Sequence, residues 1–281
     1  MPRVPARLKR RLPPQQEMNV ALHFWITPGQ IRTWAEQTHL FFILGLGRSG
    51  TTFLAHLLAE DRRARVYHEP VRRDFQAYNR AFVNPAAAQR YIARFRSRDI
   101  YLRGRDATVY GEVNSALRRH AFALQTCFPQ ATLLHLVRDG RDVVRSLAPR
   151  RTLRPDDPNT SAVQPQPYDP WYDNWPSMDR FARLCWYWQA ENAFVRQAAG
   201  ATIRFEDLLA NYDVLAASVL DPCRLHVSRA QWQQAVARPR NRTERHALAE
   251  PEAWLPEQNA TFWRICGEEM AACGYVREDA T

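Results

Sequence analysis

The sequence predicts an α/β fold, in which a central parallel sheet is flanked by helices within a single domain. Short apolar runs alternate along the chain with segments of helical periodicity, a pattern typical of parallel strands joined by crossover helices. The run at residues 131–137 is almost continuously apolar, as expected for a strand buried on both faces. The chain has 281 residues, 46% of them hydrophobic, which is enough for one large core.

The apolar runs predict five strands, and each is followed by a segment that changes to helical periodicity or to turn residues. These strands are expected at residues 40–47, 65–68, 108–113, 131–137 and 201–205. The helical segments are expected at residues 51–60, 84–96, 115–127, 178–199, 207–220, 228–237 and 257–272. Asn84 followed by Pro85 indicates an N-cap and a first-turn proline, so that helix boundary is the best defined.

Residues 149–177 interrupt this alternation with a proline-rich insertion. From Pro149 to Pro176 there are seven prolines and almost no aliphatic residues, so the segment cannot add a strand or a long helix. We predict a long loop within a domain spanning residues 40–281, preceded by a basic N-terminal extension at residues 1–39. The loop carries aromatic side chains that could form a lid or a platform for an acceptor: Tyr168, Trp171, Tyr172 and Trp175.

The balance of charge predicts an anionic ligand or acceptor. The formal net charge is +10, which suits a nucleotide, an acidic glycan, a nucleic acid or a membrane surface. Nearly all of the positive charge is arginine, because Lys9 is the only lysine. Chemistry that needs a lysine in the core is therefore excluded.

Cysteine usage and hydropathy predict a cytoplasmic protein without a transmembrane segment. No apolar run approaches the ~20 residues of a membrane span. The apolar stretch at residues 19–26 contains His23 and is followed by no small-residue cleavage site, so we do not interpret it as a secretory signal. The cysteines are scattered, without the spacing of a zinc or redox site, and suit a reducing compartment: Cys127, Cys185, Cys223, Cys266 and Cys273.

The segment Gly45–Thr52, GLGRSGTT, has the features of a phosphate-binding loop of the P-loop type. It follows a predicted strand, leads into a predicted helix and keeps the Walker A spacing of glycines, but Thr51 stands where the lysine belongs. Backbone N–H groups and the positive end of the helix dipole would bind phosphate-like oxygens there. The alternative is a tight strand-to-helix turn that binds nothing.

The missing lysine argues against nucleoside triphosphate hydrolysis, which uses that lysine together with a metal ion. Arg48 supplies a positive charge inside the loop, a position better suited to a 5′-phosphosulfate than to a triphosphate. A terminal sulfuryl group carries one negative charge fewer than a terminal phosphoryl group. Arginine and backbone donors can therefore suffice without magnesium.

The run Arg48–Thr52, RSGTT, resembles the 5′-phosphosulfate loop of the sulfotransferases that use 3′-phosphoadenosine 5′-phosphosulfate (PAPS), of the bacterial or Golgi-like carbohydrate and tyrosylprotein type. The resemblance implies PAPS as donor, adenosine 3′,5′-bisphosphate (PAP) as product and no required metal. Phe53 stands where cytosolic members stack an aromatic ring on adenine, and a core-facing position is the equal alternative. The implied donor-binding residues of this loop are Gly47, Arg48, Ser49, Gly50, Thr51, Thr52 and Phe53.

A second motif, LVRDGRDVVRS, follows the fourth predicted strand and reinforces the resemblance. Sulfotransferases bind the 3′-phosphate with an arginine at the strand end and a serine eight residues later, and Arg138 and Ser146 match. Eight residues make just over two helical turns, so the serine can face back toward the strand end. A competing interpretation makes Asp139 a magnesium ligand after a Walker B strand, but Asp139 is better explained as the N-cap of the next helix.

Sulfuryl transfer to a hydroxyl also requires a base and charge stabilisation at the leaving oxygen. Glu69, at the end of the second predicted strand, stands where relatives carry their proposed catalytic glutamate; the alternative is an ion pair with a nearby arginine. Glu112, after the third strand, is the second candidate, or else it orients an acceptor or holds an arginine. His68 is the third candidate, and Arg48 is expected to act on the leaving phosphate.

The sequence therefore predicts a cytoplasmic sulfotransferase that moves the sulfuryl group of PAPS to a hydroxyl or amine of a carbohydrate, lipid, small molecule or peptide. One alternative is a P-loop kinase-like phosphotransferase, which would need magnesium and the missing lysine. Another is a basic nucleic-acid-binding module, although no recognised motif supports it. We expect no nucleic-acid partner, and the identity of the acceptor stays open.

Overall fold

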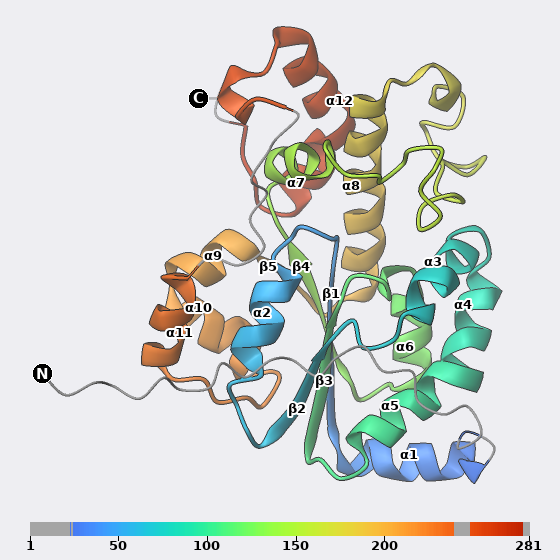
Figure 1. Cartoon of the computed structure of the whole chain (residues 1–281), viewed down its shortest axis with the longest axis vertical. Helices are drawn as coiled ribbons and strands as arrows, with labels where there is room; N and C mark the ends of the chain where they lie inside the picture. The colour runs from blue at the N-terminus through green and yellow to red at the C-terminus, as the bar shows by residue number, and fades with distance from the viewer. Residues whose placement is uncertain (1–22, 24, 239–247, 278–281) are drawn as a thin grey trace, which may run out of the picture.

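One parallel sheet organises the chain in the computed structural model, which describes residues 23, 25–238 and 248–277 (Figure 1). The strands of the sheet lie in the order β2-β3-β1-β4-β5, and every neighbouring pair is parallel. Their bounds are β1 His39–Gly45, β2 Ala64–His68, β3 Val109–Asn114, β4 Thr132–Val137 and β5 Ala201–Arg204. The predicted α/β fold with a central parallel sheet flanked by helices is confirmed.

Strand β1 shows why both faces of the sheet must be covered. Successive side chains of a strand point to opposite faces, and Phe41 and Ile43 lie in one apolar cluster while Phe42 and Leu44 lie in another. The first face is covered by α2 Thr51–Leu58, α9 Phe205–Ala210, α10 Tyr212–Leu215 and α11 Arg229–Val236. The second is covered by α1 Pro28–Gln37, α4 Pro85–Tyr91, α5 Ser97–Gly104, α6 Ala121–Cys127 and α8 Arg180–Ala198.

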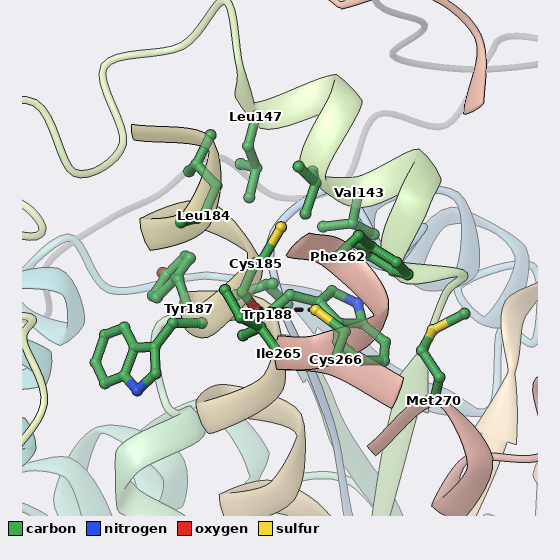
Figure 2. Packing of buried hydrophobic residues seen from close by; sticks show 14 of the residues in the cluster. Val143, Leu147, Leu184, Cys185, Tyr187, Trp188, Phe262, Ile265, Cys266 and Met270 are labelled. Carbon is green, nitrogen blue, oxygen red and sulfur yellow. Dashed lines mark hydrogen bonds between the residues drawn. The ribbon is translucent and has the colours of Figure 1, made fainter. Parts of the chain in front are cut away.

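A third apolar cluster lies beyond the carboxyl ends of the strands, between α7 Gly140–Leu147, α8 and α12 Pro256–Ala272 (Figure 2). Figure 2 shows side chains of all three helices converging there, with the Cys266 thiol donating to the Cys185 carbonyl at 3.3 Å. A Cβ added at Gly140 would lie 3.0 Å from ring atoms of both Phe262 and Trp188. Close packing therefore fixes where α7 begins.

Two predicted helices differ from the observed ones for local reasons. The helix capped by Asn84 begins as expected, with the Asn84 side chain accepting from an N–H of α4, but it continues through a π-helical turn, Ile92–Arg96, into α5. The helix expected at residues 115–127 starts late, because Asn114 Oδ1 accepts hydrogen bonds from the N–H groups of the two residues after Ser115. Its first regular turn is a 3₁₀ turn that precedes α6.

Two helices were not predicted from the sequence. Helix α1 lies in the segment predicted as a basic extension, and its Ile31 and Trp34 are buried. Residues 1–22 and 24 of that segment lie outside the described residues. Helix α3, Arg73–Val83, starts without a side-chain cap, so the sequence carries no start signal for it.

The proline-rich loop, residues 149–177, contains no strand and no long helix, as predicted; a 3₁₀ turn at Trp175–Ser177 is its one short helical element. The loop is attached to the third cluster. Arg180, at the start of α8, donates to the carbonyls of Arg150 and Thr152 at 2.7 and 3.0 Å. Trp186 of α8 donates its indole N–H to Asp169 at 2.9 Å. Hydrogen bonds near its start and at Asp169 hold the loop beside α8.

A buried charge cluster ties α3 and the π-helical turn to β3. The fully buried guanidinium of Arg96 donates to Asp74 at 3.0 Å and to Glu112 at 2.6 Å. Burial is the main cause that raises the pKa of Asp74, to about 6. Three further side chains donate to the two carboxylates: Tyr91, Tyr110 and Asn114. One arginine thus compensates two carboxylates that have no access to water.

Replacing Arg96 with Met should lower the free energy of unfolding by ~3–5 kcal/mol, since it leaves two buried carboxylates without their counter-charge. Urea denaturation of the variant measures this loss. Arg151→Met is the matched control, because Arg151 and its partner Asp156 are both about two-thirds exposed and such pairs contribute at most ~1 kcal/mol. Equal losses in the two variants would contradict the role assigned to the buried cluster.

Candidate active site

The loop between β1 and α2 has one position at which only glycine fits. Gly50 has a φ of 88°, in the left-handed region, and a Cβ added to it would lie 2.2 Å from the ring of Phe205. A Cβ added to Gly47 would instead meet no atom within 4 Å. The loop is therefore packed tightly on one side and open at Gly47, where its backbone can approach a ligand.

Two hydroxyl residues of the loop lie at its buried side. Ser49 is fully buried, and its hydroxyl has no hydrogen-bond partner among the described residues. Thr51 is also buried, and its Oγ1 lies 3.3 Å from Nε2 of His68. Thr52 follows it, half-buried in the first turn of α2. An unpaired buried hydroxyl costs free energy, so the Ser49 side chain fits an oxygen-bearing ligand held in the loop.

Phe53 lies in the core. Only 7% of it is exposed, and its ring packs edge-to-face against Phe205 at a centroid distance of 5.7 Å. Of the two alternatives that the sequence left open, this placement favours the core-facing one.

The two phosphate motifs meet at one place. Nε of Arg48 donates to Oγ of Ser146 at 2.9 Å, although the two residues are 98 positions apart. Arg138 donates to the backbone carbonyl of Arg48 at 3.4 Å and to Asp142 at 2.5 Å. Asp139 caps α7 as predicted, accepting from an N–H of the first turn at 2.8 Å. The loop after β1 and the strand end of β4 therefore form a single site.

This site concentrates positive charge. The pKa of Arg48 is lowered, first by burial and then by the charges of Arg150 and Arg138. Arg48 also has a φ of 80°, an uncommon value for a residue with a side chain. Guanidinium groups that repel one another favour a bound anion, which would offset the repulsion.

Glu69 lies at the end of β2 and contacts the turn after β3. Its Oε1 accepts from the Ser115 hydroxyl and, at 3.3 Å, from the Ser115 N–H. Its φ is 44°, and its side chain is 15% exposed. Non-glycine residues persist in the left-handed region only where their surroundings hold them, often at functional sites. Ser115 was not singled out in the sequence, where only its position after a strand end could have indicated it.

His68 connects the carboxylate to the loop. Its Nε2 lies 3.9 Å from Glu69 Oε1 and 3.3 Å from Thr51 Oγ1. Burial lowers the pKa of His68, and the charge of Glu69 opposes that shift. The end of β2 is thus in contact both with the phosphate loop and with the turn after β3.

Glu112 does not join this group. It is fully buried and bound to Arg96. Both of its oxygens already accept hydrogen bonds, from Arg96, Tyr110 and Asn114, so the placement favours the alternative in which Glu112 holds an arginine. The sequence could not distinguish these alternatives, because Arg96 comes from a π-helical turn.

Within residues 23, 25–238 and 248–277, no group of three or more His, Cys, Asp or Glu side chains could hold a metal ion. No helix in this part of the chain is long and apolar enough to span a bilayer.

The chain was also compared with known proteins. No curated protein matches the sequence. Among solved structures, the sulfotransferase STF9 from Mycobacterium avium is similar with a TM-score of 0.51 and 14% identity, over 89% of this chain and 82% of that one. A sulfotransferase from Alicyclobacillus acidocaldarius is similar with a TM-score of 0.44 and 17% identity, over 85% of this chain and 97% of that one. At such identities the first likeness concerns the fold alone.

The sequence profile of the sulfotransferase family matches residues 41–229. This range runs from within β1 to the start of α11, so it includes both phosphate motifs, Glu69, most of β1 and the other four strands of the sheet. It covers more than half of the 281 residues. The chain therefore belongs to the sulfotransferase family.

Proposed function

We propose that this sulfotransferase transfers the sulfuryl group of PAPS to the hydroxyl of an acceptor, with Glu69 as the general base. The observation that carries the proposal is the contact between Arg48 and Ser146. This contact joins two motifs into one site. One motif resembles the sequence that binds the 5′-phosphosulfate of PAPS, and the other resembles the sequence that binds its 3′-phosphate. A site with two separate anion positions suits a donor that carries a 5′-phosphosulfate and a 3′-phosphate.

The loop residues support the position of the 5′-phosphosulfate. The open backbone at Gly47 and the unpaired hydroxyl of Ser49 offer hydrogen bonds to its oxygens. Arg48 supplies positive charge, and Gly50, Thr51 and Thr52 lead into α2, whose N-terminus faces the same ligand. Arg138 and Ser146 would hold the 3′-phosphate, through forked guanidinium donors and a hydroxyl. Phe53, packed against Phe205, is not positioned to stack on adenine without moving.

The reaction exchanges one sulfur–oxygen bond for another. The acceptor oxygen forms a bond to sulfur as the bond between sulfur and the bridging oxygen of the 5′-phosphate breaks, and that electron pair leaves with PAP. Glu69 takes the acceptor proton as the new bond forms. Arg48 stabilises the charge that develops on the bridging oxygen. Ser115 orients Glu69 through its hydroxyl and its N–H.

The rival functions have less support. A P-loop phosphotransferase would need a lysine at the position of Thr51, and membership of the sulfotransferase family argues against it.

The proposal of a cytoplasmic location rests on the five cysteines, all of which are free thiols.

Arg138→Ala should weaken the affinity for PAP roughly tenfold to over a hundredfold, because a charge-assisted contact contributes ~1.5–3 kcal/mol. Calorimetric titration of both proteins gives the two dissociation constants. Adenosine 5′-phosphosulfate, which lacks the 3′-phosphate, is the control ligand, and its affinity should hardly change. A similar loss for both ligands would mean that Arg138 supports the fold and does not bind the 3′-phosphate.

Glu69→Gln should lower kcat by ~10² to 10⁴ while PAP affinity stays near that of the native protein, since it removes the base but keeps the side-chain shape. Turnover is measured with an alcohol acceptor, whose proton must be removed as transfer proceeds.

Glu112→Gln is the matched control for this variant. It should lower the melting temperature through its buried contact with Arg96 and lower kcat per folded molecule far less than Glu69→Gln does. The opposite pattern, a normal kcat for Glu69→Gln and a lost kcat for Glu112→Gln, would transfer the role of base to Glu112.

A further inference from the structure

A small cavity borders both the phosphate loop and the turn that holds Glu69. Its volume is about 180 Å³, and its lining includes Leu46 and Gly47 of the loop and Ser115, the hydrogen-bond partner of Glu69. A group in this cavity would contact Gly47 of the phosphate loop and Ser115, the residue that holds Glu69. The cavity is therefore where an acceptor hydroxyl can meet both.

The size of the cavity limits what can enter it. Pockets that enclose drug-sized ligands have volumes of ~300 to 1,000 Å³, and this one, at about 180 Å³, is smaller. Phe75 and Tyr78 of α3 and Tyr187 of α8 contribute aromatic side chains to its wall. These walls suit a single ring better than a chain of sugars or a peptide.

The charged groups of the cavity are already compensated. Arg118 donates to Glu191 at 2.6 Å, to the Tyr187 hydroxyl at 2.7 Å and to the Ser115 carbonyl. The Asp157 carboxylate accepts from the Asn159 N–H at 3.0 Å and from the Thr160 hydroxyl at 2.7 Å. Neither group offers a counter-charge, so the lining favours an uncharged ligand.

One polar atom of the wall lacks a well-aligned hydrogen bond. Tyr78 is only 2% exposed, and its hydroxyl makes no hydrogen bond of ordinary geometry within the described residues. Burial raises the pKa of the neighbouring Tyr187, whose hydroxyl accepts from Arg118, and a contact with the Tyr78 side chain opposes that rise. A buried hydroxyl without a well-aligned hydrogen bond costs free energy, and an acceptor oxygen in the cavity would supply a better partner.

The proline-rich loop contributes part of the cavity wall. Thr152, Asp157 and Thr160 line it, while residues further along the loop line a larger hollow of about 750 Å³ against α8 and α12. That hollow borders neither the phosphate loop nor Ser115. A ligand in the larger hollow therefore cannot present a hydroxyl to the donor, whereas a ligand in the smaller cavity can.

We propose that the acceptor is a compact, uncharged alcohol or phenol built on a single ring, which binds in this cavity and accepts a hydrogen bond from Tyr78. The inference rests on the proposed function, because it takes Gly47 and Ser115 to border the reacting groups. The acceptor oxygen attacks sulfur, its proton passes to Glu69, and PAP leaves with the electron pair of the broken bond. The loop acts as the wall that sets the size limit.

Three acceptors test the class directly, each incubated with the full-length protein and PAPS labelled in its sulfur. Benzyl alcohol should be sulfated with a kcat/KM at least ~10²-fold above those of 4-(hydroxymethyl)benzoate and maltotriose. 4-(Hydroxymethyl)benzoate would bury an unpaired charge, and maltotriose is larger than the cavity. Equal or faster transfer to either competitor overturns the inference, as does no transfer to benzyl alcohol by a protein that binds PAP. Failure to bind PAP would instead overturn the proposed function.

Two pairs of variants test the residues. Tyr78→Phe should raise the KM for benzyl alcohol about tenfold, keep kcat and PAP affinity, and leave the melting temperature unchanged or higher, since it removes only a hydroxyl without a well-aligned hydrogen bond. Tyr187→Phe should lower the melting temperature, because it removes a partner of Arg118. A Tyr78→Phe protein that loses stability with an unchanged KM would show that the tyrosine serves the fold alone.

Thr152→Trp tests the wall, since Thr152 is half-buried at the cavity and belongs to the loop. It should lower kcat/KM for benzyl alcohol at least ~10-fold with PAP affinity unchanged. Ser161→Trp, at an exposed position of the same loop outside the lining, should change neither. Equal activity of the two variants would place the acceptor elsewhere.

Discussion

The register between β1 and β4 is the constraint on which the site depends. Gly45 lies opposite Leu136, and a Cβ at Gly45 would come within 2.4 Å of the Leu136 carbonyl oxygen, so this pairing requires glycine. β3 pairs with one edge of β1, and β4, the next strand in sequence, pairs with its other edge, so the strand order reverses direction at β1. In open parallel sheets, ligands bind at the carboxyl ends of the strands where the order reverses. Because the two strands end together, the turns after them carry Arg48 and Arg138 into contact.

The other half of the site depends on buried charge. Arg96, held between Asp74 and Glu112, fixes the end of β3, and Asn114 then directs the turn that follows. That turn presents Ser115 to Glu69, and His68 links the same carboxylate to the phosphate loop. A cluster that never meets water therefore positions the residues proposed to meet the acceptor. Such clusters contribute little net stability, but the loss of one partner is strongly destabilising.

The positions of the strands could be predicted from the sequence better than the contacts between side chains. All five strands were placed to within about two residues, because strands buried on both faces are short apolar runs with clear ends. Helix α3 was missed because no capping side chain marks its start. The motifs at Arg48 and Ser146 were visible as local patterns, but their hydrogen bond was not. The surroundings of Phe53 and Glu112 depend on Phe205 and on Arg96 in its π-helical turn, which no local pattern indicates.

We propose that the two motifs form one site for a nucleotide with a 3′-phosphate and a 5′-anion. The most direct measurement is the shift in melting temperature caused by PAP in the presence of EDTA, compared with the shift caused by ATP with and without magnesium. PAP should cause a clear rise that needs no metal, and ATP a much smaller one, because ATP has no 3′-phosphate for Arg138 and Ser146 to bind. Equal shifts with the two nucleotides, or a shift with PAP that requires magnesium, would contradict the proposal.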